Sequence, residues 1–244
     1  MNITIFGGLN WFGKEMIERN HQSTFYIVDN CSSTNSCKTC FDEIKHYDNY
    51  EIYYSCITNK DICREVIKKS NCVMFPFLSK STFIENHLYL DAFLSICLLC
   101  REYNVKIIYA VDENQSINYY KHSIINEIGC LHSLVFHNSF VIGPMKKRDK
   151  IEEMIYFLSI RNHITITNKE DNYSTTSQVV DSYIRATELN RIEIPYERIN
   201  ESSILYTIKQ KCPKDLFYTL HGKMQEEIVL YDYISPLVYK YFTF

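Results

Sequence analysis

The chain has 244 residues and a formal net charge of -3, with 46% hydrophobic and 23% charged residues. These proportions are typical of a globular protein with a substantial core, and they argue against a disordered or fibrous chain. The near-balanced charge gives no general attraction for nucleic acid or an anionic membrane, so we expect neither as a partner. Ten cysteines follow an amino terminus without signal-peptide features, which predicts reduced thiols in a soluble, cytoplasmic protein.

Apolar segments that favour strands alternate with segments of helical composition through the first half of the chain. Because parallel strands need crossover connections, this alternation predicts an α/β, Rossmann-like, doubly wound parallel sheet with helices on both faces. The predicted strands are Asn2–Phe6, Phe25–Val28, Ile52–Ile57, Cys72–Leu78, Val105–Ala110 and Leu131–His137. The predicted helices are Trp11–Arg19, Asp61–Lys69, Thr82–Tyr103 and Tyr119–Gly129, and the polar stretch Cys31–Asn49 is predicted to be a loop with room for a short helix at Phe41–Lys45.

The regular pattern stops at Gly143 and Pro144. We therefore predict a dinucleotide-binding core over residues 1–145 and a small capping lobe, integrated with the core, over residues 146–244. The tail over residues 228–244 is rich in Tyr and Phe, so it packs on the lobe or forms an interface, which leaves a homodimer open. Helices are predicted at Ile151–Ile160, Ser177–Leu189 and Ser202–Gln210, and extended segments at Ile164–Thr167 and Ile192–Ile194.

Three of the six glycines, Gly7, Gly8 and Gly13, cluster directly after the first predicted strand. A glycine turn between a strand and a helix presents amide N–H groups to a pyrophosphate, and an acid about 20 residues later binds the ribose. Asp29 holds that position. Asn10 replaces the middle glycine of the motif and places a side chain where phosphates would approach, so a purely structural turn is the alternative. The predicted dinucleotide contacts in the loop are Gly7, Gly8, Asn10, Trp11, Phe12 and Gly13.

With three further segments, this arrangement resembles the extended short-chain dehydrogenase/reductase family of nucleotide-sugar epimerases, dehydratases and reductases. Asp61 is similar to the family's acid that meets the adenine ring. Residues 140–144 resemble the loop that usually ends Tyr-Gly-Pro, and residues 178–186 resemble the segment containing Asp-Val-Ala. The resemblance covers about residues 1–210 and is nearest to the 4-keto-6-deoxy nucleotide-sugar reductases. It implies a nucleotide-sugar substrate and NAD as cofactor; Asp29 favours NAD, while Asn30 leaves NADP open.

The family's catalytic pair departs from its pattern in this chain. The family uses Tyr-x-x-x-Lys on one helix face, because the lysine charge lowers the pKa of the tyrosine for proton transfer. Aligned on Glu127, which follows the family's lysine by four positions, the chain has Tyr119 at the tyrosine and Ser123 at the lysine. Lys121 and His122 are adjacent in sequence but point to other faces of the helix.

The family's catalytic Ser or Thr is also replaced, because Val111 and Asp112 follow Tyr109-Ala110 and the nearest hydroxyl is Ser116. Two interpretations follow. In one, a shifted set uses Tyr119 as the acid/base and Lys121 as its helper. In the other, which we prefer because a hydroxyl at Ser123 cannot supply a cation, the chain is a pseudoenzyme. Such a protein binds a dinucleotide without hydride chemistry and acts in regulation or structure through protein contacts.

Three other clusters could carry chemistry, and each has a plainer interpretation. Cys31, Cys37, Cys40 and His46 could ligate zinc, but a second pair at matching spacing is absent, so we expect no metal. Lys146, Lys147, Arg148 and Lys150 could meet a substrate diphosphate or form a solvated face. Cys97 and Cys100 are predicted to lie in the core, and His132 and His137 are predicted to be packed or hydrogen-bonded.

Overall fold

A computed structural model describes residues 1–31, 41–76, 83–111, 117–143, 148–160, 163–212, 215–216 and 218–242. By its contacts the chain divides into unit 1, Met1–Asn138 with Ser177–Ile194, and unit 2, Ser139–Thr176 with Pro195–Phe244. The predicted domains over residues 1–145 and 146–244 stay a prediction, whereas the units that the contacts define are not contiguous in sequence. Among the described residues, no helix is long and apolar enough to span a membrane.

The main sheet of unit 1 is built from seven parallel strands. They are β1 (Asn2–Phe6), β2 (Thr24–Asp29), β3 (Tyr50–Tyr54), β4 (Cys72–Phe75), β5 (Lys106–Val111), β6 (His132–Phe136) and β10 (Arg191–Glu193). Their order is β10-β6-β5-β4-β1-β2-β3, and every neighbouring pair is parallel. This confirms the predicted Rossmann-like α/β sheet. The order reverses between β1 and β4, which is where such sheets bind ligands at the carboxyl ends of their strands.

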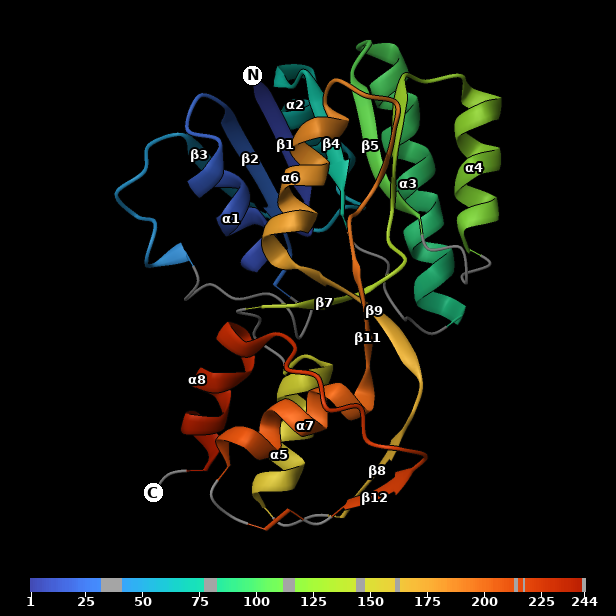
Figure 1. Ribbon diagram of the computed structural model, residues 1–244. Helices are drawn as coiled ribbons and strands as arrows, with labels where there is room; N and C mark the ends of the chain where they lie inside the picture. Colours follow the sequence, from blue (N-terminus) through green and yellow to red (C-terminus); the bar gives the residue numbers. More distant parts are fainter. Residues whose placement is uncertain are drawn as a thin grey trace. The chain divides into compact units, whose positions relative to one another are not determined.

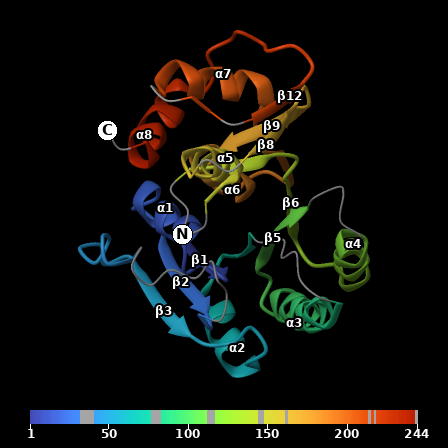
Figure 2. The ribbon, with the colours of Figure 1, turned by 90° about the horizontal axis from the view of Figure 1, so that it is seen from below.

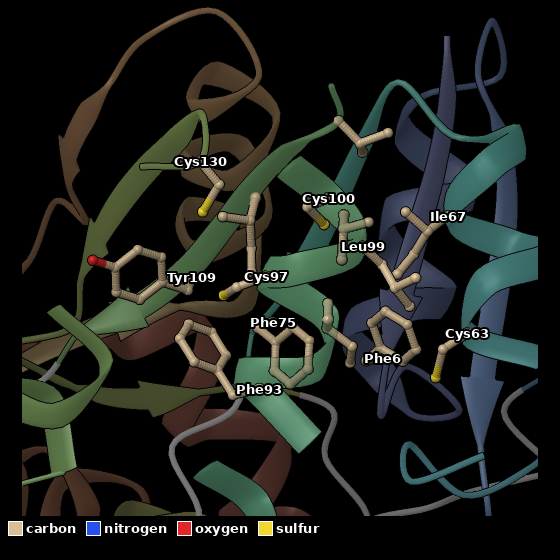
Figure 3. Close-up of a cluster of buried hydrophobic side chains, with 14 of the residues drawn as sticks. Phe6, Cys63, Ile67, Phe75, Phe93, Cys97, Leu99, Cys100, Tyr109 and Cys130 are labelled. Carbon is tan, nitrogen blue, oxygen red and sulfur yellow. The ribbon is translucent and has the colours of Figure 1, made fainter. Parts of the chain in front are cut away.

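Helices cover both faces of this sheet (Figures 1 and 2). Helices α1 (Trp11–Arg19) and α6 (Thr176–Ala186) lie side by side on one face, where Arg19 forms an ion pair with Asp181 at 2.5 Å. Helices α2 (Lys60–Lys69), α3 (Phe83–Glu102) and α4 (Ile117–Ile128) lie on the other face. They bury one apolar core against β1, β4 and β5, which Figure 3 shows in part. Burial of these two faces positions the strand ends that carry the candidate site.

Two elements of unit 1 differ from the predicted ones, and both lie in or next to the polar stretch over residues 31–49. Strand β3 runs over Tyr50–Tyr54, so it begins two residues before the predicted strand Ile52–Ile57. It pairs with β2 in a register that places Tyr53 opposite Val28. The predicted short helix at Phe41–Lys45 is wrong. Residues there form consecutive turns, with bonds from Ile44 N to Phe41 O and from Tyr47 N to Ile44 O. These three-residue steps do not continue into an α-helix. The end of the predicted strand at Leu78 lies outside the described residues.

Unit 2 has its own apolar core, which strands and helices of residues 139–176 and 195–242 surround. A mixed sheet has the order β11-β9-β7, and β12 pairs with β8 in parallel. The strands are β7 (Phe140–Ile142), β8 (Ile164–Thr167), β9 (Glu170–Thr175), β11 (Glu197–Asn200) and β12 (Tyr218–His221). The helices are α5 (Lys150–Ser159), α7 (Glu201–Lys211) and α8 (Tyr231–Tyr241).

The aromatic tail folds as helix α8 and packs within unit 2. Ile234, Val238 and Phe242 are buried in the core of the unit. The hydroxyl of Tyr233 donates to the carboxylate of Asp149, which also caps α5 by accepting from the N–H groups of Ile151 and Glu152 at 2.9 Å each. Of the two roles predicted for the tail, packing on the lobe is therefore found for the face of α8 that carries these buried residues.

The basic residues after Pro144 have partners within unit 2 where the structure describes them. Lys150 forms ion pairs with Asp171 and with Glu201, the latter at 2.7 Å. The guanidinium of Arg148 lies 3.4 Å from the centre of the Tyr156 ring, a cation–π contact. Residues 146 and 147 lie outside the described part. The diphosphate role of this cluster thus stays a prediction.

Candidate functional site

The loop after β1 needs its glycines for backbone reasons. Gly7 has φ +72°, a left-handed conformation that favours glycine, and its N–H donates to Val28 O at 2.8 Å. A Cβ on Gly13 would lie 2.0 Å from Gly8 O, so α1 begins in direct contact with the loop. This close approach brings the amino end of α1 against the carboxyl end of β1. A Cβ on Gly8 would in turn lie 2.7 Å from Cγ2 of Ile5, so all three clustered glycines have a structural reason without any ligand.

The side chain of Asn10 caps α1. It is 3% exposed, its Oδ1 accepts from Phe12 N at 2.8 Å, and its Nδ2 donates to Gly7 O at 2.7 Å. Its carbonyl accepts from Lys14 N at 3.1 Å. For the N–H groups of Trp11 and Gly13, no acceptor is present in the described part of the chain. The first turn of α1 therefore has two N–H groups without a hydrogen bond to the described part of the chain, one of them on the buried Gly13, while the Asn10 side chain binds a third.

Asp29 lies at the end of β2 and faces the glycine loop. Its carboxylate is 5% exposed; Oδ2 accepts from Leu9 N at 3.1 Å and Oδ1 accepts from Cys31 N at 2.7 Å. Each carboxylate oxygen can accept more than one hydrogen bond, so neither contact exhausts its capacity. The structure thus brings Asp29 and the loop together, as the sequence motif requires.

A second group of residues joins the strand ends on both sides of the point where the strand order reverses. Tyr183 of α6 packs against Phe12, with ring centroids 4.8 Å apart. Its hydroxyl donates to Pro76 O, after β4, at 3.2 Å, and lies 3.1 Å from Nε2 of His137, after β6. A tyrosine has one hydroxyl proton, so Nε2 of His137 carries the proton of the second bond. Sequence analysis missed Tyr183, although it lies inside the segment 178–186 that resembled the family.

Lys121 of α4 is the buried cation of unit 1. It is 0% exposed, its Nζ donates to Ala110 O at the end of β5 at 3.4 Å, and it lies 6.0 Å from the centre of the Phe93 ring. Burial lowers the pKa of Lys121 to about 8. A lysine whose pKa is lowered this close to 7, beside the end of a strand, is a candidate functional group, although burial alone also produces such a shift.

The other predicted catalytic residues do not join Lys121. Ser123 is exposed, as is His122, whose Nδ1 lies 2.9 Å from the hydroxyl of the buried Tyr109. The side chain of Tyr119 and all of Ser116 lie outside the described residues. In sequence, the residue four positions before Lys121 is Ile117, which has no hydroxyl. The lysine on the sheet side of α4 is therefore not preceded by a tyrosine at the family's spacing.

The remaining predicted residues have plainer surroundings. Asp61 is exposed in the first turn of α2, and no contact in the described ranges joins it to the glycine loop. No group of three or more metal-ligating side chains occurs among the described residues, while Cys37 and Cys40 lie outside them. Cys97 and Cys100 are fully buried, which confirms that they belong to the core.

No protein-family model matches this sequence, and no curated protein matches it. Solved structures match over nearly the whole chain. The UDP-Glc/GlcNAc 4-epimerase from Campylobacter jejuni has a TM-score of 0.71 at 10% identity, with 99% of this chain and 98% of that chain covered. A dTDP-glucose 4,6-dehydratase from Bacillus anthracis, in complex with NAD, has a TM-score of 0.74 at 12% identity, covering 98% and 96%.

A third similar structure is DesIV, a dTDP-glucose 4,6-dehydratase from Streptomyces venezuelae with NAD and TYD bound. Its TM-score is 0.72 at 8% identity, with 98% of this chain and 97% of that chain covered. Likeness at such low identity shows the fold alone. The chain has a fold similar to that of NAD-dependent nucleotide-sugar epimerases and dehydratases.

Proposed function

We propose that the chain binds a dinucleotide at the loop after β1, with NAD preferred to NADP. The observation that carries this proposal is the Asp29 carboxylate, held against the glycine loop by Leu9 N at the carboxyl edge of the sheet. An acid at the end of β2 binds the ribose hydroxyls of NAD and repels the additional phosphate of NADP. The fold is also that of proteins crystallised with NAD.

The residues of the loop fit a pyrophosphate in chemistry and conformation. The N–H groups of Trp11 and Gly13 would hold it, at a helix terminus whose dipole favours negative charge. Asp29 would hold the ribose. Asn10 would either keep its hydrogen bonds to Gly7 and Phe12 and shape the loop, or turn away and release Phe12 N.

We further propose that the chain performs no hydride chemistry on a nucleotide sugar. A bound nicotinamide supplies or accepts a hydride, and the protein must then move a proton at the reacting oxygen. The family's pattern needs a tyrosine four residues before a lysine. This chain offers Tyr119 before Ser123 and Ile117 before Lys121, so neither pair combines the hydroxyl with the cation. Activity through a shifted set that uses Tyr119 and Lys121 is the alternative.

The first test measures the melting temperature with NAD and with NADP. A ligand at about 100 times its dissociation constant stabilises by roughly 2.7 kcal/mol, which raises the melting temperature by about 5–10 °C in a chain of this size. We expect that rise with NAD and a smaller one with NADP. No shift with either, together with no heat of binding by calorimetry, would contradict the proposal.

Variants assign the site. Asp29→Asn should reduce the NAD shift by at least half, because an amide loses an acceptor for ribose. Asp91→Asn, at an exposed position of α3, is the matched control and should leave the shift unchanged. Asp61→Asn tests the predicted adenine contact. Asn10→Gly costs only a few tenths of a kcal/mol as a cap change, to which the loss of the hydrogen bond from Nδ2 to Gly7 O adds about 1 kcal/mol. A lower affinity for NAD in Asn10→Gly would mean that the Asn10 amide shapes the loop, and a higher affinity would mean that it blocks the site.

Turnover is tested separately. NADH with 4-keto-6-deoxy nucleotide sugars should show no oxidation above the rate without protein, even under conditions that give the full thermal shift. Oxidation of NADH that is lost in Tyr119→Phe would contradict the proposal of a binding protein and would support catalysis by the shifted set of Tyr119 and Lys121.

A further inference from the structure

The carboxyl edge of the main sheet has two halves, which meet where the strand order reverses between β1 and β4. In doubly wound folds each half binds one mononucleotide of a dinucleotide, and the diphosphate crosses at the reversal. The first half, over β1 and β2, holds the glycine loop and Asp29. A second nucleoside would need the carboxyl ends of β4, β5 and β6. The side chains at those ends therefore decide how much of a ligand the sheet can hold.

Tyr183 of α6 lies at the second half, and its side chain is fully buried. Its hydroxyl contacts two residues that directly follow strands. It donates to Pro76 O, after β4, at 3.2 Å, and it lies 3.1 Å from Nε2 of His137, after β6. Strand β5 runs between β4 and β6, and neighbouring strands are about 4.8 Å apart. A single oxygen atom that reaches both outer strands therefore lies beside the carboxyl end of β5.

The ring of Tyr183 also reaches the first half of the edge. It packs edge-on against Phe12, with ring centroids 4.8 Å apart and planes at 75°. Phe12 is the second residue of α1, between the two residues whose N–H groups would hold a diphosphate, Trp11 and Gly13. The phenol thus extends from the first turn of α1 to the ends of β4 and β6. A nucleoside that continued from this diphosphate into the second half would meet the ring.

The surroundings of Tyr183 hold the ring in this position. The backbone N–H of His137 donates to Val111 O at 2.8 Å, which fixes His137 beside β5. From the other face of the sheet, where α4 lies (Figure 2), the fully buried Lys121 donates to Ala110 O at 3.4 Å. Described side chains therefore approach the end of β5 from both faces. Moving Tyr183 aside would break both contacts of its hydroxyl and uncover a buried ring.

We propose that Tyr183 limits the site to one nucleoside diphosphate, so that NAD is held by its adenosine diphosphate half while its nicotinamide half stays off the sheet. The inference rests on the proposed function and narrows it, because the class of ligand becomes adenosine diphosphate, free or as part of a larger molecule. It also gives a second reason for the proposed lack of hydride chemistry. A nicotinamide that the sheet does not hold is not positioned for transfer.

Calorimetry on the full chain tests the inference with NAD, ADP-ribose and ADP. ADP-ribose keeps the diphosphate of NAD and lacks only the nicotinamide. We expect the three dissociation constants to agree within about threefold, since a ring that the protein held would add at least about tenfold in affinity. NAD that binds about tenfold more tightly than ADP-ribose, or ADP that binds about tenfold more weakly, would overturn the inference and leave the proposed function standing. No heat of binding with any of the three would overturn both.

A second measurement locates the contact on the ligand itself. Saturation-transfer NMR of NAD in the presence of the full chain should show strong transfer to the adenine protons and little to the nicotinamide protons, because only the adenosine half lies against the protein. Equal transfer to both rings would contradict the inference even if the dissociation constants agreed.

Variants test the assignment to Tyr183. Tyr183→Ala removes the ring, so the affinity for NAD relative to ADP-ribose should rise by at least about fivefold. Tyr183→Phe keeps the ring and should leave this ratio unchanged. Tyr109→Ala is the matched control, because Tyr109 is equally buried but packs against Phe93 of α3, on the other face of the sheet. Both affinities come from the same protein, so lower stability does not imitate a change in their ratio. An unchanged ratio in Tyr183→Ala would overturn the assignment.

Discussion

Replacement of Lys121 by methionine is expected to raise the free energy of unfolding at pH 7 by about 2–3 kcal/mol. Burial lowers the pKa of this lysine from 10.5 to about 8, so at neutral pH the folded protein holds a charged ammonium in an apolar region. Methionine fills a similar volume without a charge. It forgoes the hydrogen bond to Ala110 O, which offsets part of the gain.

The pH dependence gives this prediction its sign. Because the folded pKa lies below the unfolded one, the penalty is complete below pH 8 and disappears as pH rises to about 10.5. Urea unfolding of both proteins should therefore show an advantage for Lys121→Met that shrinks over this interval. Lys68→Met, at an exposed position of α2, should show no such trend. A variant less stable than the parent at pH 7 would contradict the prediction, because the interactions of the ammonium would then outweigh the cost of its burial.

The second large effect concerns the close approach of α1 to the glycine loop. Gly13→Ala should destabilise unit 1 by at least about 3 kcal/mol, because the new Cβ would lie 2.0 Å from Gly8 O, and a backbone carbonyl cannot move aside without displacing the loop. For a chain of this length we expect the melting temperature to fall by roughly 6–12 °C. NAD binding should be lost together with the loop conformation.

Gly129→Ala is the control that separates steric overlap from backbone strain. Gly129 has φ +68°, which disfavours alanine, but no atom lies within 4 Å of the position of its Cβ. We expect a cost of about 1–2 kcal/mol from conformation alone. If both substitutions cost the same, the close contact at Gly13 would not be the source of the effect.

Most of the fold was predictable because unit 1 follows simple patterns. Several of its strands are short, buried and largely apolar runs, such as Asn2–Phe6 and Cys72–Phe75, and this pattern is typical of buried parallel strands. In unit 2 the predicted extended segment Ile164–Thr167 is confirmed as β8, but the other strands were missed for the opposite reason. Residues Glu170–Thr175 carry only one apolar side chain that packs in the core, and their pairing with Glu197–Asn200 depends on tertiary contacts that no local pattern shows.

The site was predictable only as far as its backbone motif. The spacing from Gly7 to Asp29 predicted that the loop and the carboxylate come together, and the contact of Leu9 N with Asp29 agrees with it. Sequence could not show that Asn10 turns its amide inward, since this depends on two hydrogen bonds. Nor could it choose between Lys121 and Ser123, because helix register decides which one is buried, and a shift of two residues exchanges the faces.

The interleaved path of the chain constrains how it can be cut. Unit 1 takes its first 138 residues from one stretch and completes itself only with residues 177–194. A fragment that stops at residue 145 would lack α6 and β10. Strand β6 would then be an unpaired edge strand, and Phe12 would lose its contact with the ring of Tyr183. Such a fragment would present an unpaired strand to other copies and aggregate, and a peptide that restores residues 177–194 would be needed to close it.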